Sequence, residues 1–242
     1  MGEGAAMNVL RGILTWFADP AHWSGADGVP VRVAEHLGYC LLATAVATLI
    51  ALPLGVILGH TGKGGSLAIN VSNAGRAIPT FGIVILAFLV AGSGLLPITV
   101  ALVLVAIPPI LTNTYVAVRG IDRELRDAAE GMGMYGWQVV RQLEVPLAMP
   151  LIMAGVKTSA VQVVATATLA AYVSLGGLGR YIFDGLGQQV YAEVAAGAIL
   201  VAVLALGVEY GLSKVQTAVT ARGLRSTQRD DPLAAKAAAA PA

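Results

Sequence analysis

Two apolar stretches of this sequence carry polar side chains that could make reversible contacts with a small polar molecule. In the first, Thr112, Asn113, Thr114 and Tyr115 follow one another inside an uncharged run. Hydroxyl and amide groups in such a run can line a path whose contacts are weak enough to release a solute. They can equally hold two helices together, at about 0.6 kcal/mol per hydrogen bond. The sequence leaves both roles open for Thr112, Asn113 and Tyr115.

The second stretch carries its polar side chains as a stripe. At about 100° per residue in a helix, the stripe falls within one arc of roughly 140°, beside a face rich in valine. Its members are Thr158, Ser159, Gln162, Thr166 and Tyr172. Lipid does not favour such a stripe, so we expect it to face the protein interior. There it either lines a path for solute or packs against another helix. In the first case the Tyr172 ring would also attract a cationic ammonium group, by about 0.5–2 kcal/mol.

Residues with catalytic or metal-binding spacing are missing from the sequence. Residues 62–66, Gly-Lys-Gly-Gly-Ser, lack the first glycine and the spacing of a phosphate-binding loop, and they predict a short turn. The three histidines, His22, His36 and His60, do not have the spacing of metal ligands. We therefore expect no catalytic residue, no metal and no cofactor in this chain, so any nucleotide chemistry must come from another chain.

The composition is that of an integral membrane protein. Of 242 residues, 57% are hydrophobic and only 12% are charged, and the mean hydropathy is +0.76. Soluble domains are about 25% charged. The net charge of +1 gives no indication of nucleic-acid binding, so we expect none. The single cysteine, Cys40, lies in an apolar run and cannot form an intrachain disulfide.

Uncharged runs separated by glycines and charged residues predict five membrane-spanning helices. A run needs roughly 20 apolar residues to cross the hydrocarbon core. Residues 77–118 are uncharged over about twice that length, so they must fold back, and Gly92-Ser93-Gly94 is the break that permits it. The predicted spans are residues 37–59, 77–92, 95–118, 151–172 and 190–213.

The positive charges predict how these spans are oriented. Lys and Arg gather between residues 60 and 76, between 119 and 150, and after residue 213, and we expect these segments in the cytoplasm. The fold class is thus all-α, with the N-terminus outside and the C-terminus in the cytoplasm. The predicted divisions are an extracytoplasmic or interfacial segment (1–36), a transmembrane domain (37–213) and a cytoplasmic tail (214–242) that we expect to be disordered at its end.

The longest charged connection, residues 119–150, contains a patterned segment. It reads acidic-Ala-Ala, three residues, glycine, nine residues, and then apolar-x-apolar-Pro. This pattern resembles the EAA loop of ABC importer permeases, with Asp127 where that family usually has glutamate. The resemblance implies that the segment carries a coupling helix that docks on a cytoplasmic ATPase. The residues it assigns to this coupling are Asp127, Ala128, Ala129, Glu130, Gly131, Met132, Gly133 and Pro146.

Flanking stretches narrow the resemblance to the permease subunits of osmoprotectant importers of the glycine betaine, carnitine and choline type. The stretches are residues 109–115, 143–155, 166–171 and 176–179. One departure is Val173-Ser174-Leu175, where the family more often has an Ile-Gly-Ala-like stretch.

This resemblance implies ATP-driven import of quaternary ammonium solutes across the cytoplasmic (inner) membrane of a prokaryote, without enzyme activity in this chain. The implied partners are a dimer of ABC ATPase subunits that binds ATP and Mg²⁺, a second permease subunit, identical or homologous, and an extracytoplasmic substrate-binding protein. Two alternatives stay open. One is a permease of the same build for methionine or another small solute, and the other is a stand-alone channel or secondary carrier.

Overall fold

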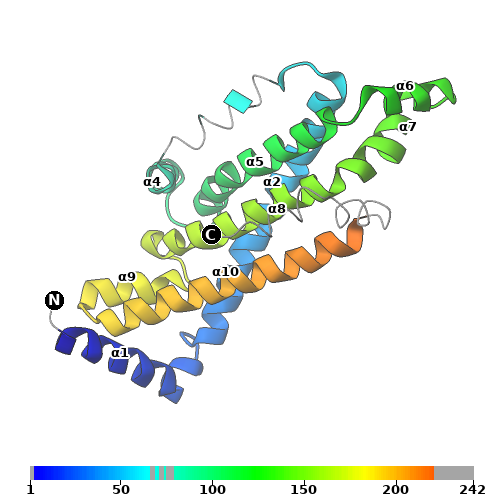
Figure 1. The fold of residues 1–242 in the computed structure, drawn as a ribbon. Helices are drawn as coiled ribbons and strands as arrows, with labels where there is room; N and C mark the ends of the chain where they lie inside the picture. The colour runs from blue at the N-terminus through cyan, green and yellow to red at the C-terminus, as the bar shows by residue number, and fades with distance from the viewer. Residues whose placement is uncertain (1–2, 66–68, 71–73, 75–78, 221–242) are drawn as a thin grey trace.

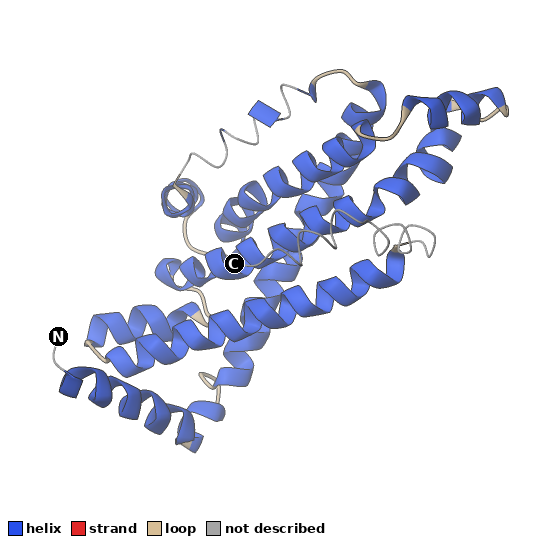
Figure 2. Ribbon diagram, viewed as in Figure 1, coloured by secondary structure: helices blue, strands red, loops and turns tan. Residues whose placement is uncertain are grey.

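The chain folds into a bundle of long helices with shorter helices gathered at its two ends (Figure 1). The computed structural model describes residues 3–65, 69–70, 74 and 79–220, and the secondary structure assigned to these residues is helical, without a strand (Figure 2). The predicted all-α class is therefore confirmed. The expected disorder of the tail concerns residues 221–242, which lie outside the described residues.

Four helical stretches among the described residues are long and apolar enough to cross a membrane. They are α2 (Val29–Thr61), α5 (Leu95–Arg119), the continuous stretch Gly136–Val173, and α10 (Tyr191–Val219). The spans predicted at residues 37–59 and 95–118 lie within α2 and α5, and the span predicted at 190–213 coincides with α10 apart from its first residue, so these three agree with the structure.

The span predicted at residues 151–172 belongs to a longer helical stretch of several geometries. It contains α7 (Gly136–Val139), the π-helix η2 (Val140–Glu144), α8 (Val145–Thr166) and the 3-10 helix η3 (Ala167–Val173). Pro146 is the second residue of α8, and it lies inside this continuous stretch because α8 follows η2 without a break. The prediction missed the earlier start of this stretch and its two changes of helix geometry.

The span predicted at residues 77–92 is a shorter helix in the structure. Its described part is α4 (Thr80–Ala91), and twelve helical residues extend only about 18 Å. Figure 1 views α4 along its axis, whereas α5 and α8 run across the view, so α4 lies at a steep angle to them. Residues 75–78 lie outside the described residues, and five spans stay a prediction.

The centre of the bundle is α5, which packs between α2 and α8. Close packing is possible because α2 presents a small buried residue at every fourth position: Ala43, Ala47, Ala51, Gly55 and Gly59. A Cβ added at Gly55 would lie 2.7 Å from the Cβ of Thr114, and one at Gly59 would lie 2.7 Å from the Cβ of Val118. Small residues at this spacing let helix backbones approach where lipid provides no hydrophobic drive for association.

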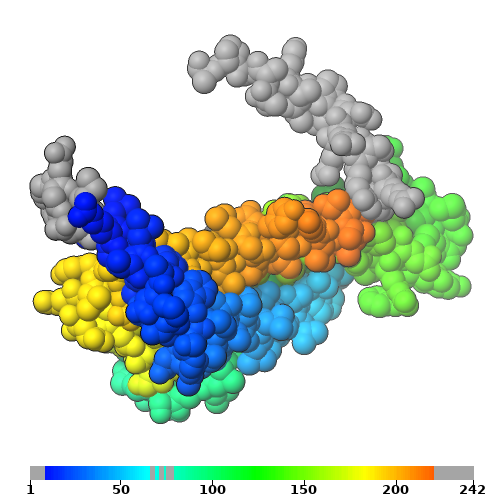
Figure 3. Space-filling model, turned by 90° about the horizontal axis from the view of Figure 1, so that it is seen from below, coloured from blue at the N-terminus to red at the C-terminus, as the bar shows by residue number. Residues whose placement is uncertain are grey.

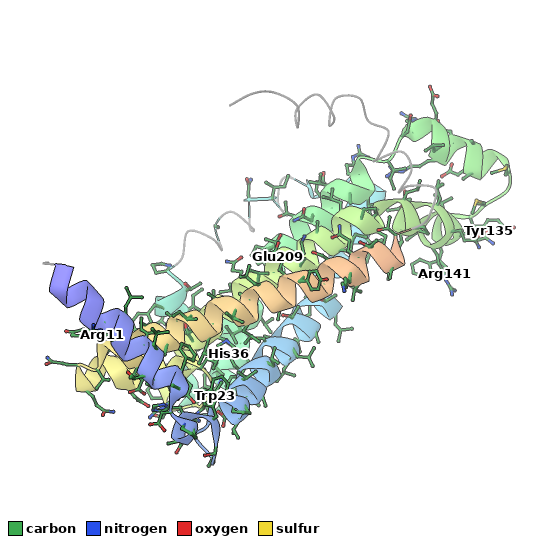
Figure 4. All side chains as sticks on the ribbon, turned by 60° about the horizontal axis from the view of Figure 1, so that its bottom comes forward. Arg11, Trp23, His36, Tyr135, Arg141 and Glu209 are labelled. Carbon is green, nitrogen blue, oxygen red and sulfur yellow. The ribbon has the colours of Figure 1, made fainter. Side chains whose placement is uncertain are left out.

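At one end of the bundle, hydrogen bonds fix the turn that precedes α9 (Gly179–Gln188). The buried His36 ring donates from Nε2 to the Val164 carbonyl at 2.9 Å and accepts at Nδ1 from the Leu178 amide at 3.3 Å. Glu35 accepts from the Gly177 amide at 2.8 Å. Figure 4 shows His36 at the end of the bundle where α1 (Glu3–Ala18) and the short helix η1 (Pro20–Trp23) also lie. No helix was predicted from the sequence between residues 172 and 190, so α9 was missed.

A tyrosine anchors α9 to the start of α2. The Tyr181 hydroxyl donates to the Asp27 carbonyl at 2.7 Å, and burial raises the pKa of Tyr181 to about 12. The hydroxyl therefore stays protonated and able to donate throughout the physiological range.

The helix α10 lies along the outside of the bundle, and Figure 3 shows its middle part (orange) exposed, with α1 (blue) crossing its beginning. Its buried residues are Ala196 and Gly197, whereas Val203, Leu206 and Tyr210 are exposed. An exposed apolar face of this kind is covered by lipid or by another transmembrane chain.

Candidate functional site

The segment that carries the coupling motif forms a small projection at the opposite end of the bundle from α9 (Figure 1). Its first part is α6 (Arg123–Gly131), which starts where the Asp122 side chain accepts a hydrogen bond from the Glu124 amide at 3.0 Å. Its second part is α7. Between them the chain reverses at Gly133, whose φ of +89° is a conformation that favours glycine. The glycine of the motif is therefore at the turn.

The projection exposes apolar side chains that the described residues leave uncovered. Met132, Tyr135 and Trp137 are each more than 70% exposed, and Leu125 is half-exposed. Figure 4 shows Tyr135 at the extremity of the projection. Apolar side chains clustered at the tip of a charged loop are typical of a surface that binds another protein.

The motif residues lie where such a contact could reach them, with one exception. Asp127, Ala128, Glu130, Gly131, Met132 and Gly133 are exposed, whereas Ala129 is buried. Pro146 lies beyond α7, at the start of α8. The structure thus places seven motif residues together on α6 and its turn, and it separates Pro146 from them.

The position of Pro146 explains the π-helix that precedes it. Proline has no N–H to bond the carbonyl four residues earlier, and its ring would clash with that carbonyl in an α-helix. The wider π turn of η2 relieves the crowding, and the Val145 amide bonds the Val140 carbonyl instead. π turns of this kind are frequent at functional sites.

The π turn points a carboxylate into the junction between the projection and the membrane helices. Glu144 is fully buried. Its Oε2 accepts from Nδ1 of His60, near the end of α2, at 2.9 Å, and its Oε1 lies 2.8 Å from Nε of Arg126 on α6. The Arg126 contact is an ion pair without the alignment of a hydrogen bond. Arg126 also donates from Nη2 to the Val118 carbonyl at the end of α5.

Sequence analysis missed this junction. The available signal was an acidic residue between apolar neighbours, Leu143 and Val145, because an ionisable side chain in such a run needs a partner. The partners could not be named, since His60 is 84 residues away and Arg126 is one of several arginines in the same loop.

The four residues of the polar cluster in α5 differ in their surroundings. Asn113 donates from Nδ2 to the Pro109 carbonyl at 2.8 Å, so it bonds its own helix near the Pro108-Pro109 pair. Thr112 and Tyr115 are half-buried. Thr114 is fully buried, and its hydroxyl has no hydrogen-bond partner among the described residues.

The stripe on α8 divides into a buried contact and more accessible side chains. Ser159 is fully buried and donates to the Ala106 carbonyl of α5 at 3.0 Å, so in this conformation it holds α8 to α5. Thr158 is exposed, and Gln162 and Thr166 are half-buried. Thr166 bonds the Gln162 carbonyl at 2.8 Å.

Tyr172 lies on η3, where the angular spacing differs from the α-helix assumed in the sequence analysis. A 3-10 helix turns about 120° per residue, which places Tyr172 at roughly the angular position of Thr166. The ring lies between Phe81 of α4 and Phe183 of α9, with ring centroids 5.0 Å and 5.8 Å away. It is about half exposed, so Tyr172 belongs to an aromatic group at the α9 end of the bundle.

The described residues contain no group of three or more His, Cys, Asp or Glu side chains that could hold a metal ion. The candidate functional regions among the described residues are therefore the projection, the junction at Glu144 and the polar residues of α5 and α8.

Comparison with known proteins places this architecture among membrane transport proteins. The family described as the binding-protein-dependent transport system inner membrane component matches residues 51–219. This range contains the projection, the junction and all the candidate polar residues.

Two curated bacterial proteins are similar over most of the chain. The glycine betaine/carnitine/choline transport system permease protein OpuCB of Bacillus subtilis is 37% identical over 194 residues, which cover 80% of this chain and 89% of that protein. The carnitine transport permease protein OpuCB of Listeria monocytogenes is 37% identical over 221 residues, covering 90% and 98%.

A solved structure has the same fold. A chain of the MetNI methionine ABC transporter in an inward-facing conformation superposes with a TM-score of 0.68 at 20% sequence identity. The match covers 91% of this chain and 100% of that one.

Proposed function

This chain belongs to the family of binding-protein-dependent transport system inner membrane components, and we propose that it is the permease subunit of an ATP-driven importer of osmoprotectants. The observation that carries the substrate class is its 37% identity, over nearly the full length, to permeases named for glycine betaine, carnitine and choline. The chain is a transport subunit, and the ATP is hydrolysed by a separate chain.

We further propose the assembly and the site of coupling. Two permease subunits form the path, two ATPase subunits bind ATP and Mg²⁺, and an extracytoplasmic binding protein delivers the solute. Docking of the ATPase on α6 and its turn is supported by the exposed apolar side chains Met132 and Tyr135 and by the motif residues around them. ATP binding would bias the permease between inward-facing and outward-facing states, as a ligand biases any two-state protein.

Among the polar residues, those that α5 and α8 leave accessible are the best candidates for the path. They are Thr112, Asn113, Tyr115, Thr158, Gln162, Thr166 and Tyr172. Ser159 is set apart from them, because it is fully buried and its hydroxyl bonds α5. The aromatic surroundings of Tyr172 support a contact with a quaternary ammonium group there.

Uptake by the reconstituted complex tests the function. Proteoliposomes that hold the permease, its ATPase and the binding protein are expected to import glycine betaine, carnitine or choline only when ATP is supplied. ATP-dependent uptake of methionine alone would indicate instead a permease of the same build for methionine. Uptake that needs no ATPase would indicate a channel or a secondary carrier.

The orientation in the inner membrane is a further proposal, with five spans, the N-terminus outside and the projection in the cytoplasm. It can be tested with single cysteines in a Cys40→Ala background. Ala26→Cys, in an exposed turn before α2, should react with an impermeant thiol reagent on intact cells, and Lys63→Cys, exposed after α2, should react only after lysis. The opposite pattern would reverse the orientation.

A further inference from the structure

We propose that Glu144 is a positioning residue that makes α6 move together with the membrane helices. The inference rests on the proposed coupling role of α6, and it explains how motion at the projection reaches α2 and α5. The three side chains Glu144, Arg126 and His60, with the Val118 carbonyl, are called the Glu144 junction.

Packing alone attaches α6 weakly to the rest of the chain. Ala129 is its only buried residue. At its start the chain passes through the turn at Gly120–Asp122, and at its end through the turn at Gly133. A helix attached only through two turns would rotate about these turns when a partner protein displaces it, because loops deform at a lower free-energy cost than packed helices. The displacement would then not reach the membrane helices.

The Glu144 junction provides the attachment that packing does not. Arg126 reaches from α6 to two separate elements, since it pairs with Glu144 of η2 and donates to Val118 of α5. Glu144 in turn accepts from His60 of α2. Through these contacts α6 is tied to the ends of α2 and α5 and to the beginning of α8.

Burial makes the three groups depend on one another. The Glu144 side chain is fully buried, that of Arg126 is 14% exposed and that of His60 is 30% exposed. A carboxylate in such a place is stable only with its partners, and loss of one partner leaves an uncompensated charge. A second arginine of α6, Arg123, also forms an ion pair, with Asp127 at 3.8 Å. Both side chains of this pair are exposed to solvent, and such a pair adds little to stability.

A spin-label distance reports directly whether α6 is held. Nitroxides at Glu124→Cys on α6 and Lys63→Cys after α2, in a Cys40→Ala background, are measured in lipid nanodiscs with and without the ATPase. We expect one narrow distance distribution for the parent protein and a clearly broader one for Glu144→Gln. Arg141→Gln is the matched control, because Arg141 lies in the same π turn, is exposed and has no ion pair among the described residues, and it should leave the distribution narrow.

Two further variants separate positioning from general loss of structure. Arg126→Gln should broaden the distribution as Glu144→Gln does, and the double variant should broaden it by less than the sum of the two, since both variants remove the shared Glu144–Arg126 contact. Arg126→Lys retains the charge and should retain most of the order. If Glu144→Gln does not reach the membrane, the Arg126 variants decide the question, because Arg126 lies on α6, outside the membrane-spanning stretches.

Transport provides the functional readout. In the reconstituted complex, Glu144→Gln is expected to lower the solute imported per ATP hydrolysed by roughly 2- to 30-fold, the range that coupling residues produce. A narrow distribution and an unchanged ratio in Glu144→Gln and Arg126→Gln would overturn the inference. The distance measurement does not depend on which solute is carried, so it stands even if the parent complex imports none of the osmoprotectants.

Discussion

Replacement of Gly55 by leucine is expected to prevent α2 from packing on α5 and to abolish the folded protein. The added Cβ alone would lie 2.7 Å from the Cβ of Thr114 and 3.1 Å from the Leu111 carbonyl. Neither neighbour can withdraw, because Thr114 is buried in the central helix and the carbonyl belongs to its backbone. Overpacking a well-packed core typically costs about 1–3 kcal/mol, and the cost here is at the upper end or above because the larger side chain must separate two helices.

Gly38→Leu is the matched control for this prediction. Gly38 lies on the same helix, and an added Cβ there meets no atom within 4 Å. It should insert and purify like the parent, since leucine is also the better helix former by up to about 1 kcal/mol. Membrane levels and the thermal unfolding midpoint in detergent measure both variants. Equal behaviour of Gly55→Leu and Gly38→Leu would contradict the close packing of α2 on α5.

The long apolar helices could be predicted from the sequence because their signal is local. An uncharged run of sufficient length has few alternatives to a helix in a membrane, since every backbone group must be satisfied within the segment. This is why α5 and α10 agree closely with residues 95–118 and 190–213. The coupling motif was equally local, because its residues are recognised by their spacing in one short segment.

Features that depend on contacts between distant parts of the chain could not be predicted from the sequence. The small residues of α2 can be read from the sequence. The helix against which they pack cannot, because the contacts are with Thr114 and Val118 of α5, about sixty residues away. α9 was missed because its glycines and Asp184 interrupt any apolar run, and its place depends on His36 and Glu35 at the start of α2.

The candidate site was predictable in part for the same reason. Seven residues of the coupling motif are consecutive, and the structure gathers these seven on α6 and the following turn, whereas Pro146 lies apart in α8. The Glu144 junction joins residues from three separate regions, so no spacing rule revealed it. The stripe on α8 was assigned with one helical period, which holds as far as Thr166 and changes in η3.

The second large effect is expected at Gly133, in the turn after α6. Its φ of +89° strains any other residue, whereas an added Cβ would meet no atom within 4 Å. Gly133→Val should therefore leave the bundle intact and displace only the turn, because the left-handed conformation costs an L-residue about 1–2 kcal/mol. Gly131→Ala, also without a close neighbour but without a positive φ, adds a side chain nearby and should have a much smaller effect.

The central claim is that this chain converts ATP hydrolysis into solute import through α6 and its turn, and the number of solute molecules imported per ATP hydrolysed tests it most directly. Parent, Gly131→Ala and Gly133→Val complexes are compared in proteoliposomes at equal membrane levels. The predicted result is that the Gly133→Val complex still hydrolyses ATP but imports about 5- to 30-fold fewer solute molecules per ATP. This factor corresponds to the free energy of about 1–2 kcal/mol that the left-handed conformation costs an L-residue. A Gly133→Val complex that assembles normally and keeps the parent ratio would contradict the claim.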